Sequence, residues 1–304
     1  MPTTNRTGDV IAVRRTLHHQ ALRRTYTEVR STRTHPGAAL VIVLHGAFQT
    51  GNALRRFSNR AFDRFADGGA VVVYPDARRR EWNGARAATM LFKSAKTVDD
   101  VGFLRTLIAD CAARHGIATD RVYLIGFSLG GQLAIRMLHD APESLTSVAL
   151  ISATLPGPGN LVVAAGRDDP VPVPVVAIHG TADPLTPYRG GHVSLRGRFS
   201  KGPHLSAPGT AGYFARRNGI DTEPVVHHLK PVPPTAPGQV TRADYPNAAA
   251  PVTLYTVVGG EHEIPGASSP KWQWLRRRAL AEFDAVAAVA EFFRLPYPTP
   301  TSPR

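Results

Sequence analysis

The chain has 304 residues, of which 43% are hydrophobic, and it carries a formal net charge of +13. Its apolar runs, such as residues 38–44, are far shorter than the roughly 18 residues of a membrane-spanning helix, which argues against such a span. Residues 1–20 lack the continuous apolar stretch of a secretory signal, and the single cysteine, Cys111, excludes an intramolecular disulfide. We therefore expect one soluble, cytoplasmic domain over residues 1–304, with its core at about 23–295.

The positive charge raises the alternative of a nucleic-acid-binding protein. The basic residues are scattered, with short clusters at residues 78–80 and 276–278, and no recognition motif accompanies them. A solvated, arginine-rich surface explains this distribution more simply. We expect neither nucleic acid nor a membrane as a partner, and the charge favours anionic substrates.

Strand-like and helix-like segments alternate along the chain. Apolar, β-branched runs predict strands at residues 39–44, 70–74, 121–125, 147–152, 174–178 and 252–257. Helical periodicity separates them, as at residues 52–66, 97–116 and 132–138. Continuously apolar strands must be covered on both faces, so the pattern predicts an α/β fold with a mostly parallel, twisted sheet between helices. Residues 23–30 alternate, which predicts an exposed antiparallel edge strand.

Three local features complete the expected architecture. Thr97 with Asp100 three residues later is typical of a capping box at the start of a helix, and Gly116 is typical of its end. Residues 188–250 are rich in glycine, proline and charge, and we interpret them as a loop-rich insertion near a cleft. Residues 296–304 are expected to be a disordered tail.

Residues 126–130, Gly-Phe-Ser-Leu-Gly, fit the G-x-S-x-G nucleophile elbow, in which a serine sits on a sharp strand-to-helix turn. The motif alone is weak in a glycine-rich chain, and a glycine-rich packing or phosphate-binding turn is the alternative. The context favours catalysis, because a strand-like run precedes the motif and a helix-like run follows it. Ser128 is therefore the candidate nucleophile.

A serine nucleophile needs a base to take its proton and an acid to orient that base. Among the twelve histidines, His262 is the strongest candidate, since it lies in a glycine-flanked loop just beyond the last predicted strand. Asp183 lies in a short turn past the preceding strand and is favoured over Asp168 and Asp169. The chain order Ser128, Asp183, His262 is that of α/β-hydrolases.

The loop at residues 45–51, after the strand at 39–44, is expected to supply an oxyanion hole. Its His-Gly start lets the backbone turn so that the N–H of Ala47, or alternatively that of Phe48, points toward the same position as the N–H of Leu129. Removing one such donor typically raises the barrier by about 3 kcal/mol.

The remaining assignments concern the walls of the site. His45 and His179 each end a strand before a glycine and are assigned structural roles. The residues expected to line the substrate pocket are His45, Phe48, Phe127 and Ile264. Neither a metal nor a cofactor is expected, because a serine triad needs none.

The sequence also resembles a known family through the segments 43–51, 71–77, 82–83, 98–108, 121–131, 178–188, 258–266 and 291–293. They are similar to the polyhydroxybutyrate depolymerase and feruloyl esterase group of α/β-hydrolases, including related lipoprotein-type esterases. The Asp-Asp-Val-Gly-Phe run at 99–103 is more specific than the elbow. The resemblance covers residues 25–295 and implies a serine carboxylesterase with Ser128, Asp183 and His262 at the triad positions.

The chain departs from that family at three places. Ala47 and Ile220 stand where many relatives have cysteines, and Ile264 stands where they commonly have a tryptophan. The chemistry therefore transfers more safely than the substrate, and we expect hydrolysis of small, soluble esters with short acyl chains. The alternatives are a serine peptidase or acyltransferase on the same fold, or a non-catalytic or nucleic-acid-binding protein.

Overall fold

The computed structural model describes residues 5–7, 10–32, 34–88, 97–163, 170–195, 199–229, 238–267 and 283–298. Its strands are β1 (Asn5–Thr7), β2 (Val10–His19), β3 (Leu22–Ser31), β4 (Leu40–Leu44), β5 (Val71–Pro75), β6 (Val122–Phe127), β7 (Ser147–Ile151), β8 (Val175–Gly180), β9 (Gly191–Leu195), β10 (Phe199–His204), β11 (Val225–His228), β12 (Val240–Tyr245) and β13 (Val252–Val257). Its α-helices are α1 (Gly51–Phe57), α2 (Arg64–Asp67), α3 (Asp100–His115), α4 (Leu129–Asp140), α5 (Ala207–Arg217) and α6 (Ala285–Phe293). Short 3₁₀ turns are η1 (Ala61–Asp63), η2 (Arg78–Arg80) and η4 (Pro142–Ser144).

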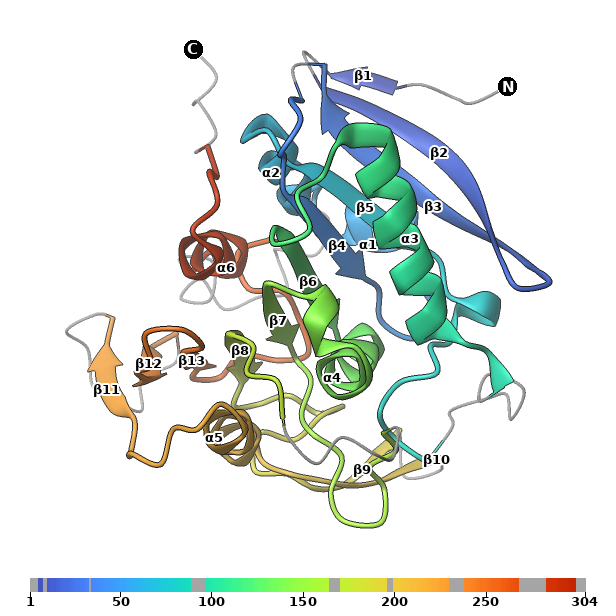
Figure 1. The fold of residues 1–304 in the computed structure, drawn as a ribbon. Coiled ribbons are helices and arrows are strands. Elements are labelled where there is room, and N and C mark those ends of the chain that lie inside the picture. Colours follow the sequence, from blue (N-terminus) through green and yellow to red (C-terminus); the bar gives the residue numbers. More distant parts are fainter. Residues whose placement is uncertain are drawn as a thin grey trace.

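One large sheet runs through the centre of the molecule (Figure 1). Within the described ranges it has eleven strands, in the order β1-β2-β3-β5-β4-β6-β7-β8-β13-β12-β11, and β9 and β10 form a separate hairpin. The strands from β5 to β13 in this order are mutually parallel. Antiparallel strands extend the sheet at both ends. This topology brings the carboxyl ends of the central strands to one edge of the sheet.

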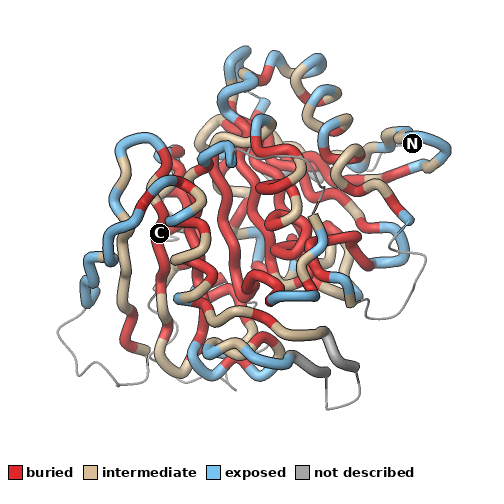
Figure 2. Tube along the Cα trace, turned by 60° about the horizontal axis from the view of Figure 1, so that its bottom comes forward, coloured by how far each residue is buried: buried red, intermediate tan, exposed pale blue. Residues whose placement is uncertain are grey.

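Helices cover both faces of the sheet. On one face, Leu104 of α3, Leu133 of α4 and Phe214 of α5 belong to one buried cluster. On the other face, Leu54 of α1 and Val289 of α6 belong to a second cluster. Every residue of β4 to β8 is buried, and Figure 2 shows burial concentrated along these strands. The predicted α/β class and mostly parallel sheet are confirmed, because strands covered on both faces carry continuous apolar runs.

The prediction that residues 23–30 form an exposed edge strand is wrong. These residues belong to β3, which lies between β2 and β5 and is largely buried. Its polar residues are buried as ion pairs: Glu28 lies 2.6 Å from Arg114, and Arg24 lies 2.7 Å from Asp100. An alternating pattern of polar and apolar residues predicts a strand with one solvent-exposed face. Here the polar residues are buried instead, because they pair with charged residues that are distant in the sequence.

Two predicted helix features also differ. The periodic segment 52–66 is interrupted, since Asn59 and Arg60 adopt left-handed φ values of 50° and 59° after α1. Helix α3 is capped by Asp99, whose carboxylate accepts a hydrogen bond from the N–H of Gly102, and Thr97 does not cap it. Asp100 instead accepts from the buried N–H of Asn83 at 2.8 Å, so the expected capping box does not form.

The segment 188–250 is more regular than expected. Its described part contains the β9–β10 hairpin, α5, and the strands β11 and β12, which extend the main sheet. Glycine and proline also lie inside these elements, as at Pro203 of β10 and Gly212 of α5, which conceals their periodicity. Within the expected tail, Tyr297 is ordered against the core, because it donates to the carbonyl of Ala61 and its ring lies against Arg64. Residues 299–304 lie outside the described residues. No described helix has the length and apolarity to cross a membrane.

Candidate active site

Ser128 occupies the turn between β6 and α4, at the carboxyl end of a central parallel strand. Its φ of 54° and ψ of −115° place a non-glycine residue in a strained region, which costs about 1–3 kcal/mol. Packing enforces this turn: a Cβ on Gly126 would lie 2.6 Å from the carbonyl oxygen of Gly130, and one on Gly130 2.4 Å from that of Leu44. The glycines let the turn close, and Ser128 remains partly exposed at the start of α4.

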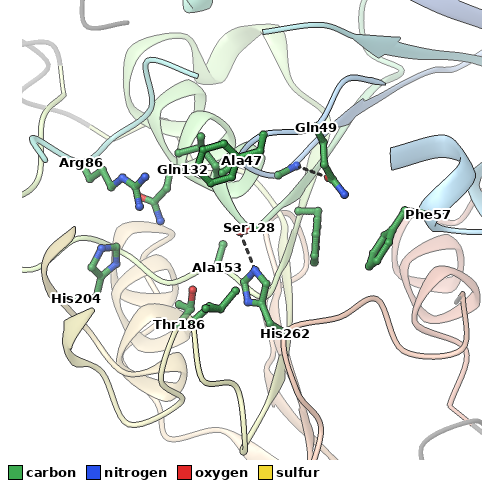
Figure 3. A pocket seen from close by; sticks show the side chains of 15 residues that line it. Ala47, Gln49, Phe57, Arg86, Ser128, Gln132, Ala153, Thr186, His204 and His262 are labelled. Carbon is green, nitrogen blue, oxygen red and sulfur yellow. Dashed lines mark hydrogen bonds between the residues drawn. The ribbon is translucent and has the colours of Figure 1, made fainter. Parts of the chain in front are cut away.

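The ends of three strands bring Ser128, His262 and Asp183 into one chain of hydrogen bonds. The Nε2 atom of His262 lies 2.8 Å from Ser128 Oγ, as Figure 3 shows, and its Nδ1 atom lies 2.8 Å from Asp183 Oδ2. A carboxylate only accepts hydrogen bonds, so Nδ1 carries the proton. Nε2 is then free to accept the Ser128 hydroxyl proton, which is the arrangement that a general base requires.

Asp183 is held rigidly in the turn after β8. Its Oδ1 atom accepts hydrogen bonds from the N–H groups of Leu185 and Thr186, each at 2.8 Å. Burial raises the pKa of Asp183, but the hydrogen bond and charge of His262, with the Thr186 N–H, outweigh burial and hold it below its usual value. Asp183 is therefore ionised at neutral pH.

His179 supports the same turn from inside the protein. Its Nε2–H donates to the carbonyl of Thr186 at 2.7 Å, and its ring is almost completely buried. Burial lowers the pKa of His179, so the ring is neutral and does not compete with His262 as a charged partner of Asp183. This position agrees with the structural role expected for His179.

The loop after β4 lines the same pocket as Ser128. Ala47 and Leu129 both line the cavity around Ser128, and in the described part of the chain neither N–H has a hydrogen-bond acceptor. The N–H of Phe48 donates instead to the carbonyl of Arg80 at 3.2 Å, so Phe48 is wrong as an alternative oxyanion donor. Ala47 and Leu129 stay the candidate donors.

Buried side chains hold this loop in place. His45 donates through Nδ1 to the carbonyl of Gly46 at 2.7 Å, and its Nε2 accepts from the N–H of Ala77 at 3.0 Å. Burial lowers the pKa of His45 to about 4, which keeps the ring neutral. Gln49 completes the turn, because its Oε1 accepts from the N–H of Gly46 at 3.1 Å. The loop is therefore rigid before any substrate arrives.

The pocket in front of Ser128 has a volume of about 280 Å³. Phe57 and Phe127 lie together in its lining, with Phe127 centred 5.3 Å from the His262 ring and 5.7 Å from Phe57, and Phe48 also lines the pocket. The polar side chains of the lining include Arg86, Gln132, Thr186 and His204. Figure 3 places Arg86, Gln132 and His204 on one side of Ser128 and Phe57 on the other.

Comparison with known proteins agrees with this geometry. Residues 25–196, more than half of the chain, match the family described as phospholipase/carboxylesterase. The chain belongs to this family. It is 29% identical over 245 residues to NocK from Nocardia uniformis subsp. tsuyamanensis, a protein named as an esterase, covering 77% of this chain and 67% of NocK.

Two more distant similarities support the family and the fold. Feruloyl esterase B of Piromyces equi is 26% identical over 225 residues, which cover 70% of this chain but only 37% of that protein. An S-formylglutathione hydrolase from Agrobacterium tumefaciens has a similar structure, with a TM-score of 0.57 at 13% identity over 96% of this chain and 98% of that one. This carboxylesterase-family chain is an ester hydrolase with the α/β-hydrolase fold.

Two of the pocket residues expected from the sequence are misplaced. His45 is fully buried behind the loop, and Ile264 is 1% exposed within the core cluster that contains α6, so neither lines the pocket of this carboxylesterase-family protein. Phe48 and Phe127 do line the pocket. The alternative acids Asp168 and Asp169 lie outside the described residues.

Sequence reasoning missed Phe57, Arg86, Gln132 and His204 as pocket residues. His204 falls in the segment expected near the cleft, and Arg86 closely follows the Trp82-Asn83 pair that contributes to the family resemblance, so weak signals existed for both. Gln132 follows the elbow by one helical turn. Among the described residues, no group of three or more histidine, cysteine, aspartate or glutamate side chains could hold a metal ion.

Proposed function

We propose that this chain is a serine carboxylesterase that hydrolyses small esters through an acyl-enzyme intermediate. The observation that carries the proposal is the chain of 2.8 Å contacts from Ser128 through His262 to Asp183, in which Ser128 and His262 line a pocket. The strained turn at Ser128 adds support, since such strain persists where the surrounding structure enforces it for function.

In the first half-reaction, Ser128 Oγ attacks the ester carbonyl carbon while His262 Nε2 accepts the hydroxyl proton. The negative charge that develops on the carbonyl oxygen is stabilised by the N–H groups of Ala47 and Leu129, aided by the positive end of the α4 dipole. Asp183 stabilises the imidazolium that forms. His262 then donates its proton to the leaving alcohol, and an acyl-Ser128 ester remains.

In the second half-reaction, a water molecule replaces the alcohol. His262 accepts a proton from this water, whose oxygen attacks the acyl carbon, and the same two N–H groups stabilise the second tetrahedral intermediate. Collapse breaks the bond to Ser128 Oγ, which recovers its proton from His262. The carboxylic acid leaves, and the enzyme returns to its starting state.

The pocket supports a small substrate. Its volume of about 280 Å³ lies just below the range of typical ligand pockets, roughly 300–1,000 Å³. The similarity to feruloyl esterase B and the motifs shared with polyhydroxybutyrate depolymerases support a carboxylic ester as the substrate class. We propose soluble esters with short acyl chains, because the pocket is small and Phe57 and Phe127 occupy part of its wall.

A fluorophosphonate probe followed by peptide mapping tests the mechanism. The probe reacts with a serine that an adjacent base activates, so we expect one labelled site, Ser128, and no labelling of Ser128→Ala. Labelling at another serine of the folded protein, or no labelling at all, would reject Ser128 as the nucleophile.

A substrate panel tests the reaction class at equal enzyme concentration. Short-chain nitrophenyl esters should be hydrolysed faster than methyl ferulate, and both faster than suspended polyhydroxybutyrate. Clearing of the polymer without turnover of soluble esters would contradict the proposed substrate class. Hydrolysis of peptide amides in preference to esters, or acyl transfer that excludes water, would instead assign the triad to a peptidase or an acyltransferase.

A further inference from the structure

The catalytic pocket contains a buried cation that the proposed ester hydrolysis does not use. Arg86 lines the pocket, yet the residue is 5% exposed. Arginine is among the residues least often buried, because removing its charge from water is unfavourable unless another group compensates. Its position in the pocket that Ser128 lines places this guanidinium where it can bind an anionic group on a substrate.

The backbone holds Arg86 firmly at the wall of this pocket. The residue before it, Ala85, donates its N–H to the carbonyl of Gln132 at 2.9 Å and accepts from the N–H of Val162 at 2.6 Å. Arg86 itself pairs with Leu161 in an isolated β-bridge. These contacts fasten the chain to the first turn of α4, next to the nucleophile elbow. Arg86 is thus part of the rigid scaffold.

Burial makes the charge of Arg86 less stable than it would be in water. Burial lowers its pKa to about 10, and the charge of Glu81 raises it by less than burial lowers it. Arg86 is still protonated at neutral pH, but its charge is less well stabilised than in water. An added anion would therefore gain more from Arg86 than from an exposed arginine, because the surroundings screen the interaction weakly.

Two neighbouring side chains complete a polar end of the pocket. Gln132 is 3% exposed and donates through Nε2 to the carbonyl of Thr154 at 2.9 Å, while its Oε1 atom has no hydrogen-bond partner in the described part of the chain. His204 donates through Nδ1 to the same carbonyl at 3.2 Å. The planar fork of a guanidinium can bind a carboxylate through two parallel N–H donors.

We propose that Arg86 is a specificity-determining residue that binds a carboxylate on the substrate, so that the preferred substrates are half-esters or other esters carrying a free carboxylate. This inference rests on the proposed esterase function. The aromatic end, with Phe57 and Phe127, accepts the apolar substituent of the ester, and the polar end with Arg86 accepts the anionic one. The scissile carbonyl then lies between them at Ser128.

Matched pairs of esters test the proposal. One pair places the carboxylate on the acyl side, 4-nitrophenyl hemiglutarate against 4-nitrophenyl valerate. The second places it on the alcohol side, 3-carboxyphenyl butyrate against phenyl butyrate. For at least one pair, Arg86→Gln should lower kcat/KM for the anionic ester by roughly 10–100-fold, mainly through KM, while the neutral ester changes by less than about 3-fold.

Two further variants make the result specific. Arg86→Lys keeps the charge without the planar fork, so it should recover part of the preference for the anionic ester. Arg105→Gln removes one positive charge from an exposed position on α3 and should leave both rates unchanged. An equal loss for anionic and neutral esters in Arg86→Gln, or the same loss of preference in Arg105→Gln, would overturn the proposal.

A binding measurement separates this inference from the esterase proposal. If the wild type hydrolyses neither ester of either pair, the proposed esterase function is wrong. Calorimetry of glutarate binding to Ser128→Ala then still tests whether Arg86 binds a carboxylate. Binding that disappears in Ser128→Ala/Arg86→Gln, and that Arg86→Lys partly restores, supports the anion site. Binding that is absent from Ser128→Ala, or unaffected by Arg86→Gln, contradicts it. If Arg86→Gln does not fold, Arg86→Lys decides in both assays.

Discussion

The two loops that form the candidate site, the elbow after β6 and the loop after β4, follow neighbouring parallel strands and reach the same pocket. Each contains a non-glycine residue with positive φ, Ser128 at 54° and Phe48 at 63°. They hold this strain by different means. The elbow is held by backbone packing around glycines, whereas the β4 loop is held by hydrogen bonds from buried side chains.

This difference predicts how each loop tolerates change. A turn that packs against main-chain atoms cannot accommodate an added side-chain atom, because main-chain atoms cannot rotate away as a side chain can. A loop held by side-chain hydrogen bonds can lose one contact and keep its general course, at about 1–3 kcal/mol for each buried group left unpaired. Substitutions in the elbow should therefore abolish activity or folding. Substitutions in the β4 loop should reduce activity or stability only in part.

The largest expected effect concerns the base that serves the elbow. His262→Ala should reduce kcat by roughly 10⁴-fold or more, about as much as Ser128→Ala, because triad members act as a unit. Steady-state hydrolysis of a nitrophenyl ester measures it. His179→Ala is the control, since His179 supports the Asp183 turn without contacting Ser128, and should mainly lower stability. Near-normal turnover in His262→Ala would remove His262 as the base.

The packing of the elbow is tested by adding one methyl group. Gly130→Ala should lower the free energy of unfolding by more than about 3 kcal/mol, since its Cβ would lie 2.4 Å from the carbonyl oxygen of Leu44. Urea denaturation measures it. In the control Gly212→Ala, within α5, the nearest atom lies 3.4 Å away, and alanine should stabilise the helix by up to about 1 kcal/mol. Equal stabilities for the two variants would refute rigid packing.

The β4 loop should respond to pH through His45. Its folded pKa is about 4 against an ordinary 6.5, so the unfolded chain binds more protons between these values, and stability falls as pH falls from about 6.5 toward 4. The loss attributable to His45 is about 3 kcal/mol at 1.4 kcal/mol per unit.

The variant His45→Gln isolates this contribution, because the other buried histidines remain. Its urea stability should decline less between pH 6.5 and 4 than that of the wild type, while at pH 7 its kcat should be roughly 10–100-fold lower through a displaced Ala47 N–H. Parallel stability curves for the two proteins would show that His45 is not buried in its neutral form.

The smallest effect is expected at Phe48. Phe48→Gly removes the strain of a left-handed backbone in the folded state, but it also increases the conformational entropy of the unfolded chain. Because these two effects oppose each other, the free energy of unfolding should change by less than about 1 kcal/mol. The KM for esters should rise, because an aromatic wall of the pocket is removed. Thermal denaturation and initial rates measure both. A loss of stability above 2 kcal/mol, by the same measurements, would show that the Phe48 ring supports the loop.

Much of this architecture could be predicted from local sequence. Continuous apolar runs predict strands that are covered on both faces. A serine between glycines directly after such a run predicts the nucleophile elbow. Histidine and aspartate in short turns past later strands could be assigned because parallel strands bring their carboxyl ends to one edge. These inferences need only periodicity, glycine spacing and chain order.

Other features depended on contacts between distant segments. The buried pairs Glu28–Arg114 and Arg24–Asp100 made β3 internal although its pattern resembled an edge. Likewise, Ile264 faces the core and Arg86 faces the pocket because of how their loops pack against α6 and α4. The sequence by itself determined the fold and the candidate triad, since these follow from local patterns. The pocket walls were decided by the tertiary structure, because side-chain direction in a loop is set by packing partners that lie far away in the chain.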